Sequence, residues 1–143
     1  MLFRSPPAMV AFDAPRRAVC IAKRERTDSP LQALILLNGV QYVEAARVLG
    51  ETLHREAAGD LPNIIEQAGL RCLSRRPDTQ EIEILTRLYN QQRSHFEAHP
   101  ADAELLLSIG QSPRDTSIAP AFAAAATVLA QALLNHDECV VRR

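Results

Sequence analysis

The stretch Ser29-Pro30-Leu31-Gln32-Ala33-Leu34-Ile35-Leu36-Leu37 decides the fold class of this 143-residue chain. A serine before a helix can accept a hydrogen bond from an unpaired amide of the first turn, and a proline at the first helical position loses no needed donor. A glutamine three residues after the serine can bond back to the cap. The stretch therefore predicts that a helix begins at Ser29 and runs through Leu37.

The rest of the chain repeats helical patterns separated by turn residues. Apolar residues recur every three or four positions, as they do on the buried face of a helix. This period predicts helices over residues 40–58, 61–73, about 79–99, 101–110 and 118–134. We expect an all-α fold of five or six helices in an antiparallel bundle-like array, with residues 29–143 as the helical domain and residues 1–28 as an extended arm.

Residues 40–58 show the clearest mixture of apolar and charged positions. The apolar stripe consists of Tyr42, Ala45, Ala46, Leu49, Leu53 and Ala57. The charged residues Glu44, Arg47, Glu51 and Arg55 fall opposite this stripe. We therefore expect these four side chains in solvent, with Glu51 and Arg55 spaced as a favourable ion pair on one helix face.

The composition indicates how the core is built. Apolar residues make up 47% of the chain, but aromatic residues only 4%, and tryptophan is absent. The core must therefore be made of leucine, isoleucine, valine and alanine, which suits helices that pack closely. Gly69, inside a predicted helix, and the run Ala123–Ala126 mark places where another segment approaches the backbone.

Residues 1–28 differ in charge from the remainder of the chain. They hold six basic and three acidic residues, whereas residues 29–143 hold ten basic and fourteen acidic ones. Pro6, Pro7 and Pro15 favour extended backbone in this part. We expect a basic arm that lies on an acidic helical face. Nucleic-acid binding is not expected, because no aromatic residue alternates with the arginines to stack on bases.

Several kinds of site are not expected from the sequence. Cys20, Cys72 and Cys139 lie far apart and outside any Cys-x-x-Cys or Cys-x-x-Cys-His pattern, so neither zinc nor covalently attached haem is predicted. His95 and His99 have a spacing that can bind a metal, but the accompanying glutamate is misplaced for a zinc protease. We expect no metal and no cofactor in this chain, no signal peptide and no membrane insertion.

Two further polar motifs are expected to have structural roles. The cluster His136-Asp137-Glu138 follows the last predicted helix and is interpreted as helix-end polar groups that bind carbonyls. The pair Arg75-Arg76 is interpreted as a solvated loop or as arginines that bond helix carbonyls, with anion binding as the alternative.

Segments distributed along the chain together resemble a planctomycete-associated domain of unknown function, the DUF1553 family. They are Phe12–Pro15, Cys20, Arg24–Asn38, Val43–Arg47, Arg76-Pro77 and Leu133–Glu138. The resemblance implies large, exported, multi-domain proteins that often carry a c-type cytochrome domain upstream. It also implies that this chain corresponds to the C-terminal part of the family domain. Arg16 departs from the family, which usually has an acidic residue at this position.

The sequence leaves two functions open. The first is a non-catalytic helical module that docks to upstream domains of the parent protein or to a protein partner. The alternative is a polar cluster that contributes to an enzyme or carbohydrate-binding site completed by the upstream region. Its residues are Asp13, Arg24, Arg26, Thr27 and Asp28. Helix capping explains Ser29 but not these residues, and arginine and aspartate near a helix start can bind an anionic or sugar-like ligand.

Overall fold

The computed structural model describes residues 11–12 and 29–140, and within these residues the chain forms seven helices and no strand. The helices are α2 (Pro30–Asn38), α3 (Val40–Glu56), α4 (Leu61–Leu73), α5 (Thr79–Ala98), α6 (Pro100–Leu107), α7 (Pro120–Leu134) and α8 (Asp137–Val140). The expected all-α class is confirmed. The number of described helices exceeds the expected five or six because residues 137–140, expected in a polar tail, form the short helix α8.

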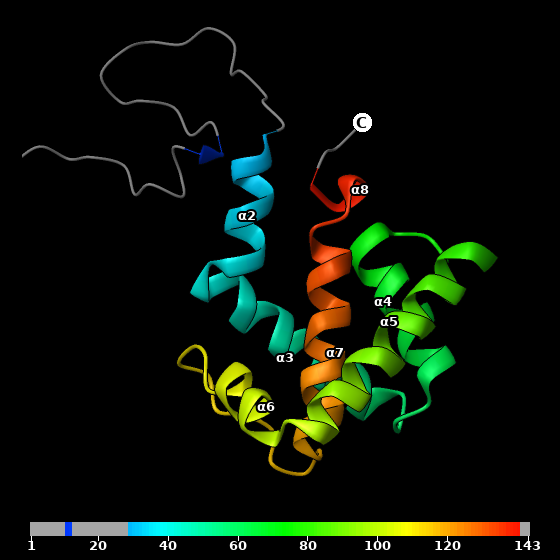
Figure 1. The fold of residues 1–143 in the computed structure, drawn as a ribbon. Helices are drawn as coiled ribbons and strands as arrows, with labels where there is room; N and C mark the ends of the chain where they lie inside the picture. The colour runs from blue at the N-terminus through cyan, green and yellow to red at the C-terminus, as the bar shows by residue number, and fades with distance from the viewer. Residues whose placement is uncertain (1–10, 13–28, 141–143) are drawn as a thin grey trace, which may run out of the picture.

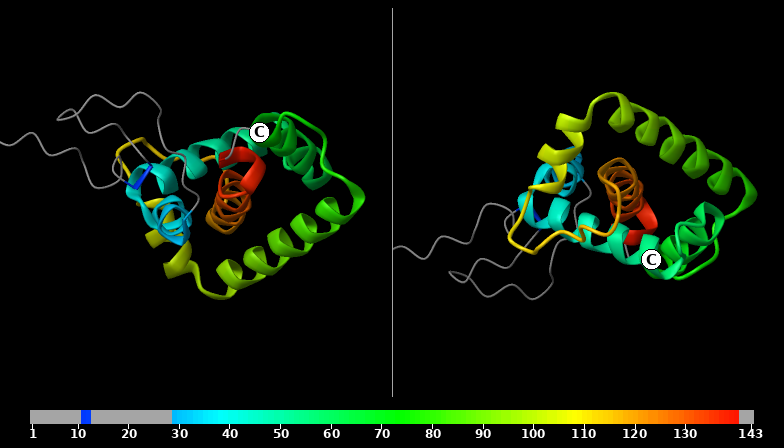
Figure 2. Two further views of the ribbon diagram at one scale, coloured as in Figure 1. Left: turned by 90° about the horizontal axis from the view of Figure 1, so that it is seen from above. Right: turned by 90° about the horizontal axis from the view of Figure 1, so that it is seen from below.

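Helix α7 lies at the centre of the molecule. Viewed along its axis in Figure 2, it is surrounded by α3, α4, α5 and α6, while α2 rises from one end of α3 in Figure 1. Eight of its fifteen residues are buried, including the whole run Ala123–Ala126. A helix that is buried on most of its circumference needs small side chains, and the alanines of α7 meet this need.

The backbones of α3 and α7 touch at Gly50. A Cβ atom at Gly50 would lie 2.8 Å from the carbonyl carbon and oxygen of Ala126 and 2.9 Å from the amide nitrogen of Thr127. The close approach expected at the alanine run is therefore confirmed. Gly69 has a similar role, since a Cβ atom there would lie 2.4 Å from Cγ of Pro77.

The core has two parts along α7. The larger part lies between α3, α4, α5 and α7 and includes Leu53, Ile64, Ile65, Tyr89 and Leu129. The smaller part lies beneath α6 and includes Phe96, Ala103, Leu107, Ile118 and Ala124. Phe122 packs against both parts, so the two form one continuous apolar interior around α7.

Helix starts follow the capping signals of the sequence. The amide of Ser29 donates to Oε1 of Gln32 at 3.1 Å, as a capping box requires. At α5, Oδ1 of Asp78 accepts from the Glu81 amide at 2.8 Å, and Oε2 of Glu81 accepts from the Asp78 amide at 2.8 Å. The first and fourth predicted helices therefore begin where the sequence places them.

The expected orientation of α3 is wrong for its charged residues. Arg47 and Glu51 were expected in solvent, but their exposed fractions are 1% and 5%, whereas Ala45 of the expected apolar stripe is exposed. The physical reason is Gly50, which must face α7 because it alone lets the two backbones touch. That rotation turns Arg47 inward, where Nη1 donates to Oε1 of Glu51 at 3.1 Å and Nη2 to the carbonyl of Ser112 at 2.7 Å.

The described helices include none that is both long enough and apolar enough to cross a membrane.

Candidate functional site

The residues proposed from sequence for a polar site, Asp13, Arg24, Arg26, Thr27 and Asp28, lie outside the described residues. Their described neighbours are Ala11, Phe12 and Ser29. Nε2 of Gln32, in the first turn of α2, donates to the carbonyl of Ala11 at 2.8 Å. The residues that flank positions 13–28 on both sides therefore lie together at the start of α2.

Phe12 strengthens this attachment. Its ring lies 6.1 Å from the ring of Tyr42, centre to centre, with the two planes tilted by 51°. Aromatic pairs at such separations attract each other beyond simple burial. The residue immediately before Asp13 is thus held against the beginning of α3.

The α2 face, defined as Leu31, Leu34, Leu37 and Val40, is apolar and exposed. The exposed fractions of these four side chains range from 42% to 60%. The buried residue of α2 is instead the polar Gln32, whose amide is bonded to Ala11 and to Ser29. Helix α2 therefore presents leucines outward and a polar residue inward, the reverse of an ordinary surface helix.

The sequence that carries the α2 face is uncharged. No charged residue occurs from Ser29 to Val43, and neither the first nor the last turn of α2 holds an acidic or basic side chain. A contiguous apolar surface of this kind on a folded protein marks an interaction site. The sequence contained this signal, because the run Leu34–Leu37 is too apolar for a helix with one buried face.

A shallow groove lies on the outer side of α3. Its lining comprises Gln41, Glu44, Ala45, Val48, Leu49, Thr52, Arg71 and Ser112. Oε1 of Glu44 accepts from the amides of Gln111 at 2.9 Å and Ser112 at 2.6 Å. Hydrogen bonds from Ser112 are the main cause that lowers the pKa of Glu44. This carboxylate fixes the loop between α6 and α7 against α3.

Arg75 joins three segments of the chain. Its guanidinium donates to both carboxylate oxygens of Glu81 at 2.8 and 2.7 Å and to Oε2 of Glu138 at 2.8 Å. The bond from Arg75 is the main cause that lowers the pKa of Glu81 to about 2. Arg76 pairs with Glu66 at 2.9 Å. The arginine pair is therefore occupied by carboxylates of the same chain, rather than by helix carbonyls.

The histidines of the two other motifs have different surroundings. The rings of His95 and His99 stack with centres 4.7 Å apart, and Nε2 of His95 lies 3.6 Å from Oδ2 of Asp102. In the described part of the chain, no group of three or more histidine, cysteine, aspartate or glutamate side chains is arranged to hold a metal ion. His136 instead lines an apolar pocket, where its Nδ1 accepts from the Glu138 amide at 3.3 Å.

The described cysteines are not activated nucleophiles. Cys72 and Cys139 are both free and partly buried. Burial is the main cause that raises the pKa of Cys72 to about 11, and burial also raises the pKa of Cys139. Since the thiolate is the reactive form, these thiols are poorly suited to catalysis at neutral pH.

Comparison with known families decides the affiliation of the chain. The model of the PSD1 family, described as a protein of unknown function (DUF1553), matches residues 3–89. The chain belongs to this family. The match includes helices α2, α3 and α4 and the first half of α5, so the α2 face lies inside the PSD1 region. No curated protein and no solved structure matches the chain.

Proposed function

We propose that this PSD1 chain is a helical docking module and that its α2 face binds another protein domain. The observation that carries the proposal is the inverted character of α2, which exposes Leu31, Leu34 and Leu37 while it buries Gln32. Full burial of one leucine side chain contributes about 1.5–3 kcal/mol, so covering this face would stabilise a complex considerably.

The partner surface should be apolar and uncharged. The stretch from Ser29 to Val43 offers no charge for an ion pair, so a strongly charged partner would lose solvation without compensation. The resemblance to multi-domain proteins favours the upstream domains of a PSD1 protein as this partner. On this proposal the chain has a binding role and contains no catalytic centre of its own.

A Leu34→Glu variant tests the proposal. The purified chain is titrated calorimetrically with a separately produced upstream domain of a PSD1 protein. We expect the dissociation constant to rise at least about tenfold in Leu34→Glu, because a buried carboxylate would replace a leucine. Leu105→Glu is the matched control, since Leu105 has an exposed fraction of 68% and lies on α6.

Two results would overturn the docking proposal. One is equal binding by the wild type, Leu34→Glu and Leu105→Glu. The other is a dimer of the isolated chain that dissociates in Leu34→Glu, measured by light scattering, because a second copy would then occupy the α2 face.

The alternative function, a polar site around Asp13, is supported by a separate observation. The bond from Gln32 to Ala11 brings the described neighbours of residues 13–28 together. We propose as a second candidate that Asp13, Arg24, Arg26, Thr27 and Asp28 contribute to a site for a carbohydrate or an anion. This site would be completed by an upstream domain.

A ligand screen by thermal unfolding tests this second candidate. The sample is the complex of the chain with the upstream domain, and the probes are soluble oligosaccharides and sulfated sugars. We expect a probe to raise the unfolding temperature of the wild type but not of Asp13→Ala. The control is Glu83→Ala, which removes an exposed carboxylate that lies on α5. Equal stabilisation of all three proteins would contradict this candidate.

A further inference from the structure

Two of the three cysteines lie on helices that contact each other. Cys72 is in the last turn of α4, and Cys139 lies in α8. Helices α4 and α8 are in contact, although α5, α6 and α7 separate them in the chain. Both thiols are free and partly buried. The contact therefore brings two thiols from distant parts of the chain into one region of the fold.

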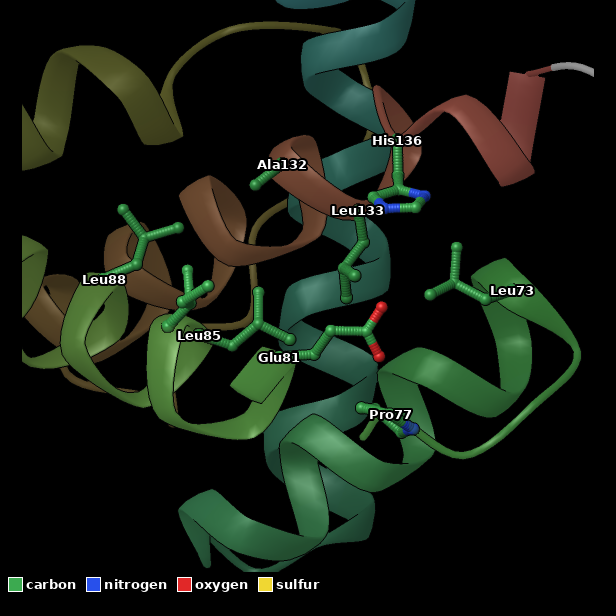
Figure 3. Close-up of a pocket in the computed structure, with 9 residues that line it drawn as sticks. Leu73, Pro77, Glu81, Leu85, Leu88, Ala132, Leu133 and His136 are labelled. Carbon is green, nitrogen blue, oxygen red and sulfur yellow. The ribbon is translucent and has the colours of Figure 1, made fainter. Parts of the chain in front are cut away.

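The neighbours of these cysteines meet at one pocket. Leu73, next to Cys72, and His136, in the turn before α8, line the same apolar pocket between α4, α5 and α7 (Figure 3). The amide of Cys139 donates to the carbonyl of His136 at 2.9 Å, so Cys139 lies within one helical turn of that residue. Both cysteines are therefore close to the same edge of the pocket.

An ion pair holds the two segments together. Nε of Arg75, three residues after Cys72, donates to Oε2 of Glu138 at 2.8 Å. Glu138 directly precedes Cys139. The end of α4 and the helix α8 are thus joined at a position adjacent to both thiols.

The electrostatics of Cys72 agree with this arrangement. Burial is the main cause that raises the pKa of Cys72, and the negative charge of the Cys139 thiolate is the next cause. Because a Coulomb interaction weakens with distance, this second contribution requires the two sulfur atoms to lie near each other.

We propose that Cys72 and Cys139 form an intramolecular disulfide, which fastens α8 to α4, when the chain meets a disulfide oxidant. Such a bond requires Cα atoms about 4.4–6.8 Å apart. Helix α8 has no buried residue, so it can adjust toward α4 without opening the core. This modification is independent of the α2 face, since the two share no residue.

Two exchange steps with glutathione disulfide give the product. The thiolate of Cys139 attacks one glutathione sulfur, forms a mixed disulfide and releases one glutathione thiolate. The thiolate of Cys72 then attacks the Cys139 sulfur and releases the second glutathione. The cysteines lose two electrons, which glutathione gains, and the two thiol protons end on the released glutathione molecules.

The bond would act mainly on the unfolded chain. It closes a loop that contains α5, α6 and α7. A cross-link across a long loop lowers the conformational entropy of the unfolded state. We expect the unfolding temperature of the oxidised protein to exceed that of the reduced protein by at least about 5 °C.

Oxidation of the whole chain with glutathione disulfide tests the proposal. The reaction is run at about pH 9, because burial raises the pKa of both thiols and the thiolate is the reactive form. Remaining thiols are blocked with N-ethylmaleimide, and linked peptides are identified by mass spectrometry. We expect a Cys72–Cys139 linkage within a monomer, with Cys20 outside it. Unfolding temperatures are measured before and after reduction.

Serine variants separate the thiols. Cys139→Ser should fold, because α8 has no buried residue, and its unfolding temperature should not depend on oxidation. Cys72→Ser should likewise lose the dependence on oxidation. Cys20→Ser is the matched control and should form the linkage like the wild type.

Each of the following outcomes overturns the proposal. One is a wild type in which Cys72 and Cys139 remain free or carry only glutathione after oxidation. Pairing of either residue with Cys20 or with a second chain is another. Equal unfolding temperatures of the linked and reduced wild type would show that the bond does not constrain the fold. A rise on oxidation that persists in Cys139→Ser would assign the effect to other thiols.

Discussion

At the scale of single residues, Arg47 is the most informative side chain of this protein. It is almost completely buried, it bonds to Glu51 and to the Ser112 carbonyl, and its Nε atom has no hydrogen-bond partner. A buried charge that loses its partner stays out of water without compensation. The removal of one partner therefore costs more stability than the removal of both. Arg47 therefore fixes the geometry of α3 against the loop between α6 and α7.

We expect Arg47→Ala to destabilise the protein by about 3–5 kcal/mol, because Glu51 would remain buried without a partner. The double substitution Arg47→Met with Glu51→Leu should cost much less, since it removes both charges and retains apolar volume. Urea unfolding of the wild type, Arg47→Ala and the double variant measures these differences. A cost below about 1 kcal/mol for Arg47→Ala would show that Glu51 reaches solvent without its partner.

Gly50 permits a second prediction at this scale. Gly50→Ala should destabilise the protein by about 1–3 kcal/mol, because the new methyl group would meet helix backbone that cannot move aside. The contact is with the carbonyl of Ala126, 2.8 Å from the added atom. Urea unfolding measures the cost, and Ala45→Ser at an exposed position of α3 is the control. A stabilised Gly50→Ala variant would mean that α3 and α7 can separate without loss.

At the scale of elements, the cluster of Arg75, Glu81 and Glu138 connects the α4–α5 loop, the first turn of α5 and α8. Glu81 serves twice, since it also accepts from the Asp78 amide in the capping box of α5. Its carboxylate must be ionised to accept both arginine bonds. The contacts between these elements should consequently weaken at acid pH.

The direction of this dependence follows from the pKa of Glu81. The folded value of about 2 lies below the ordinary value of 4.5, so ionised Glu81 stabilises the fold. Its contribution is fully present above about pH 4.5 and is lost as the pH falls toward about 2. We expect the unfolding temperature of Glu81→Gln to fall less steeply over this interval than that of the wild type, as followed by circular dichroism.

The comparison must be made between the two proteins, because other carboxyl groups also respond to acid. The pKa values of Glu44, Asp115 and Glu138 are lowered as well, mainly by hydrogen bonds from Ser112, Ser117 and Arg75 respectively. The wild type should therefore lose stability in acid for several reasons. Parallel curves for the wild type and Glu81→Gln would show that Glu81 contributes nothing to the acid response.

Local signals at the helix ends were sufficient to predict where α2 and α5 begin. The capping residues Ser29 and Asp78 determine helix starts through bonds within four residues, so the sequence contains the whole cause. The orientation of α3 could not be predicted in the same way. It depends on which residue of α3 meets α7, about seventy residues later in the chain, and a stripe of apolar residues cannot reveal that a glycine faces the core.

The candidate sites likewise combine features that the sequence reveals with features that depend on tertiary packing. The apolar character of the α2 face is visible in the sequence, but its exposure depends on how the described helices pack around it. The pocket at His136 joins residues from Leu73 to His136, and no short motif links them. The polar cluster from Asp13 to Asp28 lies outside the described residues, so its arrangement stays a prediction.

At the scale of the whole molecule, α7 is the element that holds the fold together. It contacts α3, α4, α5 and α6, and both parts of the core include its residues. Helices α2 and α8 lie at the periphery, and α8 has no buried residue. Removal of α7 from its place would expose both parts of the core at once, so opening of α7 requires unfolding of the whole domain.

Hydrogen exchange tests this hierarchy of stability. Amides of α7 from Ala124 to Leu129 should exchange only through global unfolding, and therefore more slowly than those of α8 by at least about a hundredfold. Amides of α2 should exchange at an intermediate rate, because its leucine face is exposed while Gln32 anchors its first turn. Binding of a partner to the α2 face should slow exchange in α2 and leave the rates of α8 unchanged. If α7 exchanged as fast as α2 in the free protein, the two parts of the core would open independently, and α7 would not be the structural centre of the domain.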